Sequence, residues 1–199
     1  MSLVVLDIEC MDNYIVKELG IYQDGVVKGY SFRPPKDFKP TKQSYWLTSH
    51  LHGINWDSGV HEYSDIGQIL NAVNSTNAEF FAKGSEKCKF LSNMVQKRVE
   101  NLDSFLCPNA QQLIFRSENA DSEIICSSYP WRHSKTQHCA ERKAHVYGTW
   151  MKDHLKILSW NSNCINYSYY HTHHYWIKYC LLIKFLSMCS NNLFRQPTM

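Results

Sequence analysis

The sequence has no apolar run long enough to cross a lipid bilayer, and charged residues enter its first apolar run at Asp7 and Glu9. A transmembrane helix needs about 20 mainly apolar residues, and a secretory signal peptide needs an uncharged apolar core. We therefore expect an intracellular protein, cytoplasmic or nuclear, with no membrane partner. The eight cysteines are then expected to be reduced thiols.

Acidic residues are absent after Asp153, although four of the 21 basic residues lie there. The residues up to Asp153 therefore carry 17 basic and 18 acidic side chains, and the net charge of +3 belongs to the C-terminal part. Residues 1–153 thus lack a general attraction for nucleic acid, so any binding surface there has to be a local patch.

Two carboxylates, Asp7 and Glu9, stand near the end of the apolar run of residues 2–10. Side chains two residues apart on a strand point to the same face, so both acids are expected to project together from a buried strand. Carboxylates so placed repel each other unless a cation lies between them, and Mg²⁺ or Mn²⁺ takes oxygen ligands of this kind. The pair indicates phosphoryl chemistry. Two solvated acids at a strand end are the alternative.

The remaining pattern predicts a single α/β domain over residues 1–158, with a mixed sheet led by the Asp7 strand. Residues 17–35 read as two strands joined by a tight turn at Asp24-Gly25, and residues 78–82 as a further strand. Helices are expected near residues 64–75, 85–100 and 138–158, the second with Ser85 as its N-cap. Two short apolar runs, residues 113–115 and 124–125, are further candidate strands. Residues 159–199 contain no glycine and no acid, and we predict an irregular tail without an assigned function.

Several motifs resemble those of the DEDDh 3′-to-5′ exonucleases, members of the ribonuclease-H-like superfamily. The matching residues are Asp7-x-Glu9, Glu18-Leu-Gly20, Leu51-His-Gly-Ile54, Phe90-Leu91 and His138-x-Ala140 with Ala144. The resemblance implies a ribonuclease-H-like mixed sheet flanked by helices. It also implies catalytic roles for Asp7 and Glu9, and for His138 as the base that orients an attacking water.

Lysine occupies the positions of the other two family carboxylates, at Lys87 and Lys143. A metal pair needs about four carboxylates to offset its charge, whereas these ammonium groups would neutralise Asp7 and Glu9 themselves. We therefore predict that both lysines approach the two acids. The resemblance then implies a degenerate member of the family, with an active magnesium-dependent exonuclease that recruits other acids as the alternative.

Degenerate members include the Maelstrom domain, which the chain also resembles and in which a Glu-Cys-His-Cys set binds zinc. The comparable residues are Glu18, His133 and Cys139, while Pro130 replaces one cysteine. His138 or Cys126 is the candidate fourth ligand. His and Cys side chains suit tetrahedral zinc, but buried thiols and a capping histidine are the alternative.

Basic and aromatic residues near these motifs indicate a nucleic-acid surface. The candidates are Lys83, Lys87, Arg142 and Lys143, with Trp46 as a platform for an unpaired base. The Maelstrom resemblance favours single-stranded RNA over DNA. Solvated helix faces are the simpler explanation, and a protein-interaction scaffold is a second alternative function.

Overall fold

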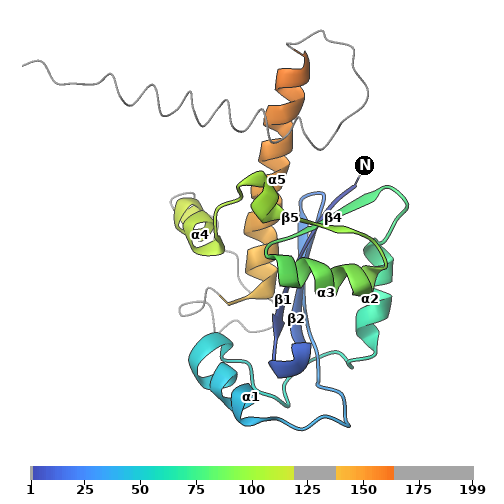
Figure 1. Cartoon of the computed structure of the whole chain (residues 1–199), viewed down its shortest axis with the longest axis vertical. Coiled ribbons are helices and arrows are strands. Elements are labelled where there is room, and N and C mark those ends of the chain that lie inside the picture. The colour runs from blue at the N-terminus through green and yellow to red at the C-terminus, as the bar shows by residue number, and fades with distance from the viewer. Residues whose placement is uncertain (1, 119–137, 164–199) are drawn as a thin grey trace, which may run out of the picture.

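The computed structural model describes residues 2–118 and 138–163 (Figure 1). A five-stranded mixed sheet with the order β3-β2-β1-β4-β5 forms its centre. The strands are β1 (Ser2–Cys10), β2 (Val16–Gln23), β3 (Val26–Ser31), β4 (Ala78–Ala82) and β5 (Val99–Asn101). β1 is antiparallel to β2 and parallel to β4, while β3 and β5 lie at the two edges.

Helices cover both faces of this sheet. They are α1 (Lys42–Leu47), α2 (Asp65–Val73), α3 (Ser85–Val95), α4 (Ala110–Glu118) and α5 (Ala140–Asn163). Shorter helical segments are η1 (Asp12–Tyr14), η2 (Thr48–His52) and η3 (Leu102–Phe105). Among the residues that the structure describes, no helix combines the length and the apolarity needed to span a membrane.

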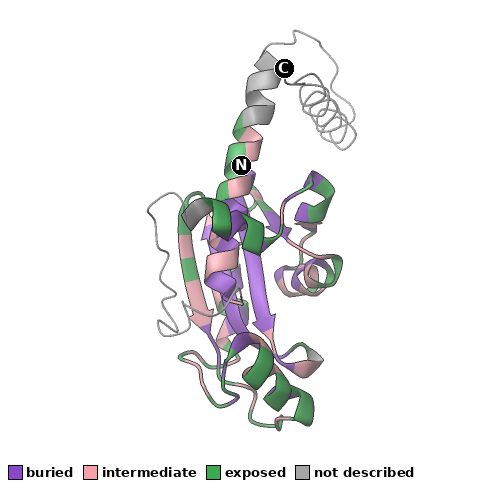
Figure 2. Cartoon of the chain, turned by 90° about the vertical axis from the view of Figure 1, so that its left-hand side faces the viewer, coloured by how far each residue is buried: buried purple, intermediate pink, exposed green. Residues whose placement is uncertain are grey.

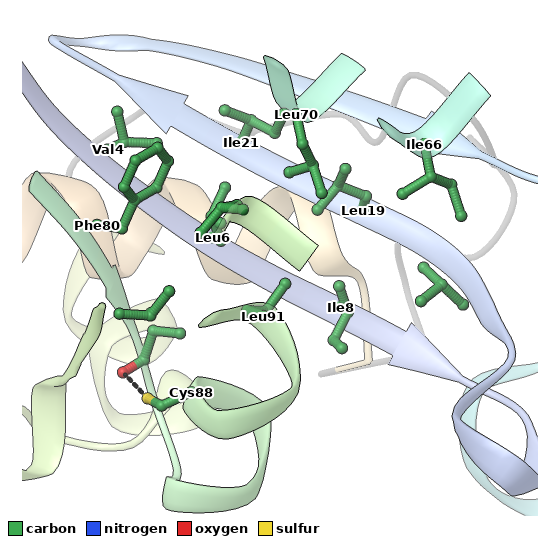
Figure 3. Close-up of a cluster of buried hydrophobic side chains, with 14 of the residues drawn as sticks. Val4, Leu6, Ile8, Leu19, Ile21, Ile66, Leu70, Phe80, Cys88 and Leu91 are labelled. Atoms are coloured by element: carbon green, nitrogen blue, oxygen red, sulfur yellow. Dashed lines mark hydrogen bonds between the residues drawn. The ribbon is translucent and has the colours of Figure 1, made fainter. Parts of the chain in front are cut away.

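β1 is buried along its length because alternate side chains enter two different cores (Figure 2). On one face, Val4, Leu6 and Ile8 pack with residues of α2 and α3, as Figure 3 shows. On the other face, Leu3 and Val5 pack with residues of α4 and α5. A strand that is buried on both faces reads as a continuous apolar run, which explains the sequence of residues 3–6.

Glycine lets α5 lie directly against the sheet. A Cβ atom at Gly20 of β2 would lie 2.1 Å from the carbonyl oxygen of Ala140, at the start of α5. Further along α5, a Cβ atom at Gly148 would lie 2.2 Å from the ring of Tyr22. The absence of these side chains therefore sets the distance between α5 and β2.

Several predicted elements are confirmed. The strand at residues 2–10 and the helices near residues 64–75 and 138–158 are present, with somewhat different ends. The tight turn forms at Asp24 and Gly25, both of which have positive φ angles, 51° and 107°. Together they give an α/β domain with a mixed sheet flanked by helices, a layout compatible with a ribonuclease-H-like fold.

Other predictions about single elements are wrong. The helix expected over residues 85–100 ends at Val95, because Gln96 adopts a left-handed conformation (φ 53°) and β5 follows. Its N-cap is Gly84, and Ser85 is its first helical residue. Residues 113–115 belong to α4 and form no strand. Residues 124–125 lie outside the described residues.

Candidate functional site

Asp7 and Glu9 lie on the face of β1 that α5 covers, in phase with Leu3 and Val5. The ladder between β1 and β4 ends at Val5 and Phe81, two residues before Asp7. From there the chain of β4 turns into α3, so β1 passes beyond its parallel neighbour. This geometry lets side chains from both α3 and α5 reach the two carboxylates.

Both lysines make that approach. The Lys87 ammonium on α3 donates a hydrogen bond to Asp7 Oδ1 over 2.7 Å. The Lys143 ammonium on α5 donates to Glu9 Oε1 and lies 3.8 Å from Asp7 Oδ2. The predicted contacts are therefore confirmed, and we refer to Asp7, Glu9, Lys87 and Lys143 as the carboxylate–lysine cluster.

The cluster is largely buried. The side chains of Asp7 and Glu9 are 1% and 8% exposed, Lys143 is 13% exposed and Lys87 is 31% exposed. Burial raises the pKa of Asp7 above its ordinary value, although Lys87 and Lys143 oppose this effect. For Glu9, burial acts in the same direction, but Lys143, Lys87 and His138 outweigh it and lower its pKa. Glu9 is thus the more strongly held anion of the two.

Lys143 stays charged in this setting. Burial disfavours its ammonium form, but Asp7 and Glu9 more than offset that cost and raise its pKa. Within the described residues, Asp7 Oδ2 is buried and has no hydrogen-bond partner. Two cations therefore face two anions in a site that water scarcely enters, where such interactions are stronger than at the surface.

Two further predicted site residues lie beside the cluster. His138 is near enough to Glu9 to help lower its pKa. Glu18 on β2 is directly opposite Glu9 in the antiparallel ladder, and its Oε2 atom accepts a hydrogen bond of 3.4 Å from the backbone N–H of Ala140. The sequence motifs thus converge on one end of β1.

The carboxylate–lysine cluster does not fit a pair of divalent metal ions. Mg²⁺ and Mn²⁺ need free carboxylate oxygens, and here the ammonium groups of Lys87 and Lys143 occupy positions against Asp7 and Glu9. A divalent cation between the same oxygens would face two positive charges at close range, which is a strong repulsion in a buried site. Glu141, the acid nearest to Lys143 along α5, lies against Gly29 of β3.

The structure describes only part of the predicted zinc set. Cys139 is buried, and its Sγ atom accepts from the backbone N–H of Arg142 over 3.5 Å. Glu18 reaches the same turn of α5 through Ala140, whereas His133 and Cys126 lie outside the described residues. Within residues 2–118 and 138–163, no three His, Cys, Asp or Glu side chains gather in a way that could hold a metal ion. Zinc binding stays a prediction.

The predicted nucleic-acid residues differ in their contacts. Lys83 lies 2.5 Å from Asp103 and donates to the carbonyl of Cys107, so it holds the start of α4 in place. Trp46 is 54% exposed, and its ring stacks on His50 with centroids 5.2 Å apart. Arg142 is half-buried on α5, next to Lys143.

Sequence reasoning did not find two polar residues that hold the loops near the ends of β1 and β2. Asp12, just after β1, accepts hydrogen bonds from the hydroxyls of Thr41 and Ser44 and thereby anchors α1 beside the carboxylate end of β1. Lys17 is fully buried and donates to the carbonyls of Trp56 and Ser58. Hydrogen-bond partners that lie about 20 or more residues away in the sequence cannot be predicted from a polar residue at the end or start of a strand.

Aromatic side chains also line this end of the molecule. Tyr14 is 48% exposed and stacks on Phe90, one turn beyond Lys87 on α3, with ring centroids 5.3 Å apart. The stack joins the loop after β1 to α3.

No family model matches this chain, and no curated protein matches it either. The resemblance to DEDDh exonucleases and to the Maelstrom domain therefore stays a prediction, which rests on the motifs quoted above.

Proposed function

We propose that this protein is a nucleic-acid-binding, exonuclease-like domain that binds single-stranded RNA and does not cleave it by two-metal chemistry. The observation that carries the proposal is the carboxylate–lysine cluster. Lys87 and Lys143 neutralise the two carboxylates that a magnesium-dependent nuclease would use.

Two features support nucleic-acid binding at this end of the molecule. The exposed Trp46–His50 stack offers an aromatic face to an unpaired base, and stacking of this kind contributes about 1–3 kcal/mol per base. Asp12 anchors the helix that carries Trp46 to the loop after β1. Lys87 at the cluster and Arg142 on α5 add positive charge. The preference for RNA follows from the Maelstrom resemblance.

An exonuclease assay tests the absence of two-metal catalysis. A 5′-labelled single-stranded RNA is incubated with the full chain in Mg²⁺, in EDTA, and with the Asp7→Asn variant. We expect no ladder of shortened products in any of the three reactions. A Mg²⁺-dependent ladder that disappears with Asp7→Asn would establish the active exonuclease instead.

A binding assay tests the other half of the proposal. Fluorescence anisotropy with the same RNA should show weak binding that falls steeply as salt rises, because Lys and Arg contacts to phosphates release counterions. Trp46→Ala should weaken binding, and Trp56→Phe is the matched control because Trp56 is buried. Absence of binding to both RNA and DNA would favour the protein-interaction scaffold.

A further inference from the structure

We propose that Lys87, backed by Lys143, binds one backbone phosphate of the single-stranded RNA at the carboxylate–lysine cluster, without a metal ion. The inference rests on the proposed function and makes it more specific. In this arrangement, the ammonium groups of Lys87 and Lys143 supply the positive charge that attracts the phosphate.

Lys87 has the free donors and the access that this contact needs. An ammonium group carries three N–H donors, and within residues 2–118 and 138–163 Lys87 uses one of them, for Asp7 Oδ1. Its side chain is 31% exposed, in contrast to 1% for Asp7. The Lys87 side chain therefore reaches solvent at the edge of the cluster, where a phosphate oxygen can accept from its ammonium group.

Lys143 supplies charge from deeper in the cluster. It is 13% exposed and is held by Glu9 Oε1, with Asp7 Oδ2 at 3.8 Å. These contacts fix both ammonium groups before any ligand arrives, so little side-chain entropy is lost on binding. The buried carboxylates thus position the lysines and do not themselves contact the phosphate.

The most exposed charge of the cluster is positive, that of Lys87. The two lysines balance the two carboxylates of the cluster, while Glu18 lies opposite Glu9 and is itself buried. Because the carboxylates lie inside and Lys87 lies at the surface, an approaching ligand meets the ammonium group first.

The test compares Lys87→Gln with Lys89→Gln in the full chain. Both lysines lie on α3, and Lys89 is exposed and about 200° away around the helix axis. Binding of a labelled oligouridylate is measured over a series of salt concentrations. We expect Lys87→Gln to raise Kd roughly tenfold, as for one charged hydrogen bond, and to reduce the salt slope by about 0.7. Lys89→Gln should leave the slope unchanged.

A double variant covers the case in which Lys87→Gln unfolds because Asp7 loses its partner. Asp7→Asn with Lys87→Gln removes both charges and keeps groups that can hydrogen-bond, so it should fold and show the same loss of slope. Equal slopes in the folded double variant, Lys89→Gln and the wild type would overturn the inference and leave the proposed function intact. A wild type that binds no RNA at all would overturn both.

Discussion

At the residue scale, Glu9 and Lys143 form a buried ion pair, and the effect of substitution on stability depends on whether one partner or both are replaced. Removal of one partner from a buried ion pair leaves an uncompensated charge and costs about 3–5 kcal/mol. Replacement of both partners by neutral groups costs much less. The net contribution of the pair to stability is therefore much smaller than the cost of removing one partner.

We expect Lys143→Met to lower the free energy of unfolding by about 3–5 kcal/mol, and Glu9→Gln with Lys143→Met to recover most of that loss. Urea denaturation of the two single variants and the double variant measures the coupling. Lys156→Met is the control on the same helix, because the Lys156–Asp153 pair is 64% and 62% exposed and should contribute about 0–1 kcal/mol. Equal decreases in the free energy of unfolding for Lys143→Met and Lys156→Met would mean that the buried ion pair contributes no more to stability than the exposed one.

Lys17 shows the opposite electrostatic situation, a buried ammonium group whose hydrogen bonds go to backbone carbonyls. It donates to the carbonyl oxygens of Trp56 and Ser58 over 2.6 and 2.5 Å. Burial lowers its pKa to about 8, with Asp57 acting in the other direction. The lysine still carries its charge at neutral pH and ties the segment before α2 to β2.

We expect Lys17→Met to destabilise the fold by about 1–3 kcal/mol at neutral pH, because two carbonyls lose their donor. Between about pH 8 and the ordinary lysine pKa of 10.5, the unfolded chain holds a proton that the folded chain has released. The free energy of unfolding of the wild type therefore rises with pH in this window. The difference in free energy of unfolding between the wild type and Lys17→Met should therefore increase as the pH rises through this window.

Urea denaturation at neutral pH and at about pH 10 checks this difference. Lys28→Met is the control, because Lys28 is an exposed lysine of β3. It shows the effect on stability of replacing a lysine that has no buried contacts. A gap between wild type and Lys17→Met that narrows with rising pH would contradict the assigned pKa direction.

At the element scale, the fit of α5 to the sheet decides whether Lys143 reaches Glu9. A side chain at Gly20 would overlap the backbone of Ala140, which neither group can avoid by rotating a side chain. The start of α5 would have to move away from β2. Since Lys143 lies within the first two turns of this helix, its ammonium group would move with it.

We expect Gly20→Ala to destabilise the protein by about 3 kcal/mol, at the upper end of overpacking costs. Gly67→Ala is the matched control, because Gly67 lies in α2 and a Cβ atom there would have no heavy atom of another group within 4 Å. Alanine is the better helix residue, so this variant should gain about 0.5–1 kcal/mol. Thermal unfolding of both variants provides the measurement. A Gly20→Ala protein as stable as Gly67→Ala would refute the close approach of α5.

Sequence reasoning succeeded at this scale where a local rule was sufficient. Strand periodicity placed Asp7 and Glu9 on one face, and the spacing of the family motifs brought Lys87 and Lys143 toward them. It failed where a tertiary contact decides. The facing pair of Glu9 and Glu18 depends on the register of β1 against β2, which no residue pattern announces.

Helix ends and short apolar runs failed for a related reason. Apolar spacing continues from α3 into β5, so periodicity alone did not show that the helix stops at Gln96. Residues 113–115 are apolar enough for a strand, but Leu113 and Ile114 pack on α5 as one side of a helix. A run of three residues does not distinguish these two cases.

At the scale of the whole molecule, zinc would link β2, the segment around His133 and the start of α5. The predicted ligands are Glu18, His133 and Cys139, with His138 or Cys126 as the fourth. In the described residues, Glu18 and Cys139 already accept hydrogen bonds from the first turn of α5. The two side chains thus act as caps for the helix N-terminus, whether or not a metal is also bound.

Cys139→Ser separates the two roles, because serine is a good N-cap residue but a poor ligand for zinc. The zinc prediction requires one tightly bound zinc per chain by elemental analysis, a lower Tm after EDTA, and loss of both metal and stability in Cys139→Ser. Cys88→Ser is the control, since this buried thiol donates to the carbonyl of Ala82 instead. Unchanged melting in EDTA, with Cys139→Ser as stable as the wild type, would leave Cys139 and Glu18 as helix caps alone.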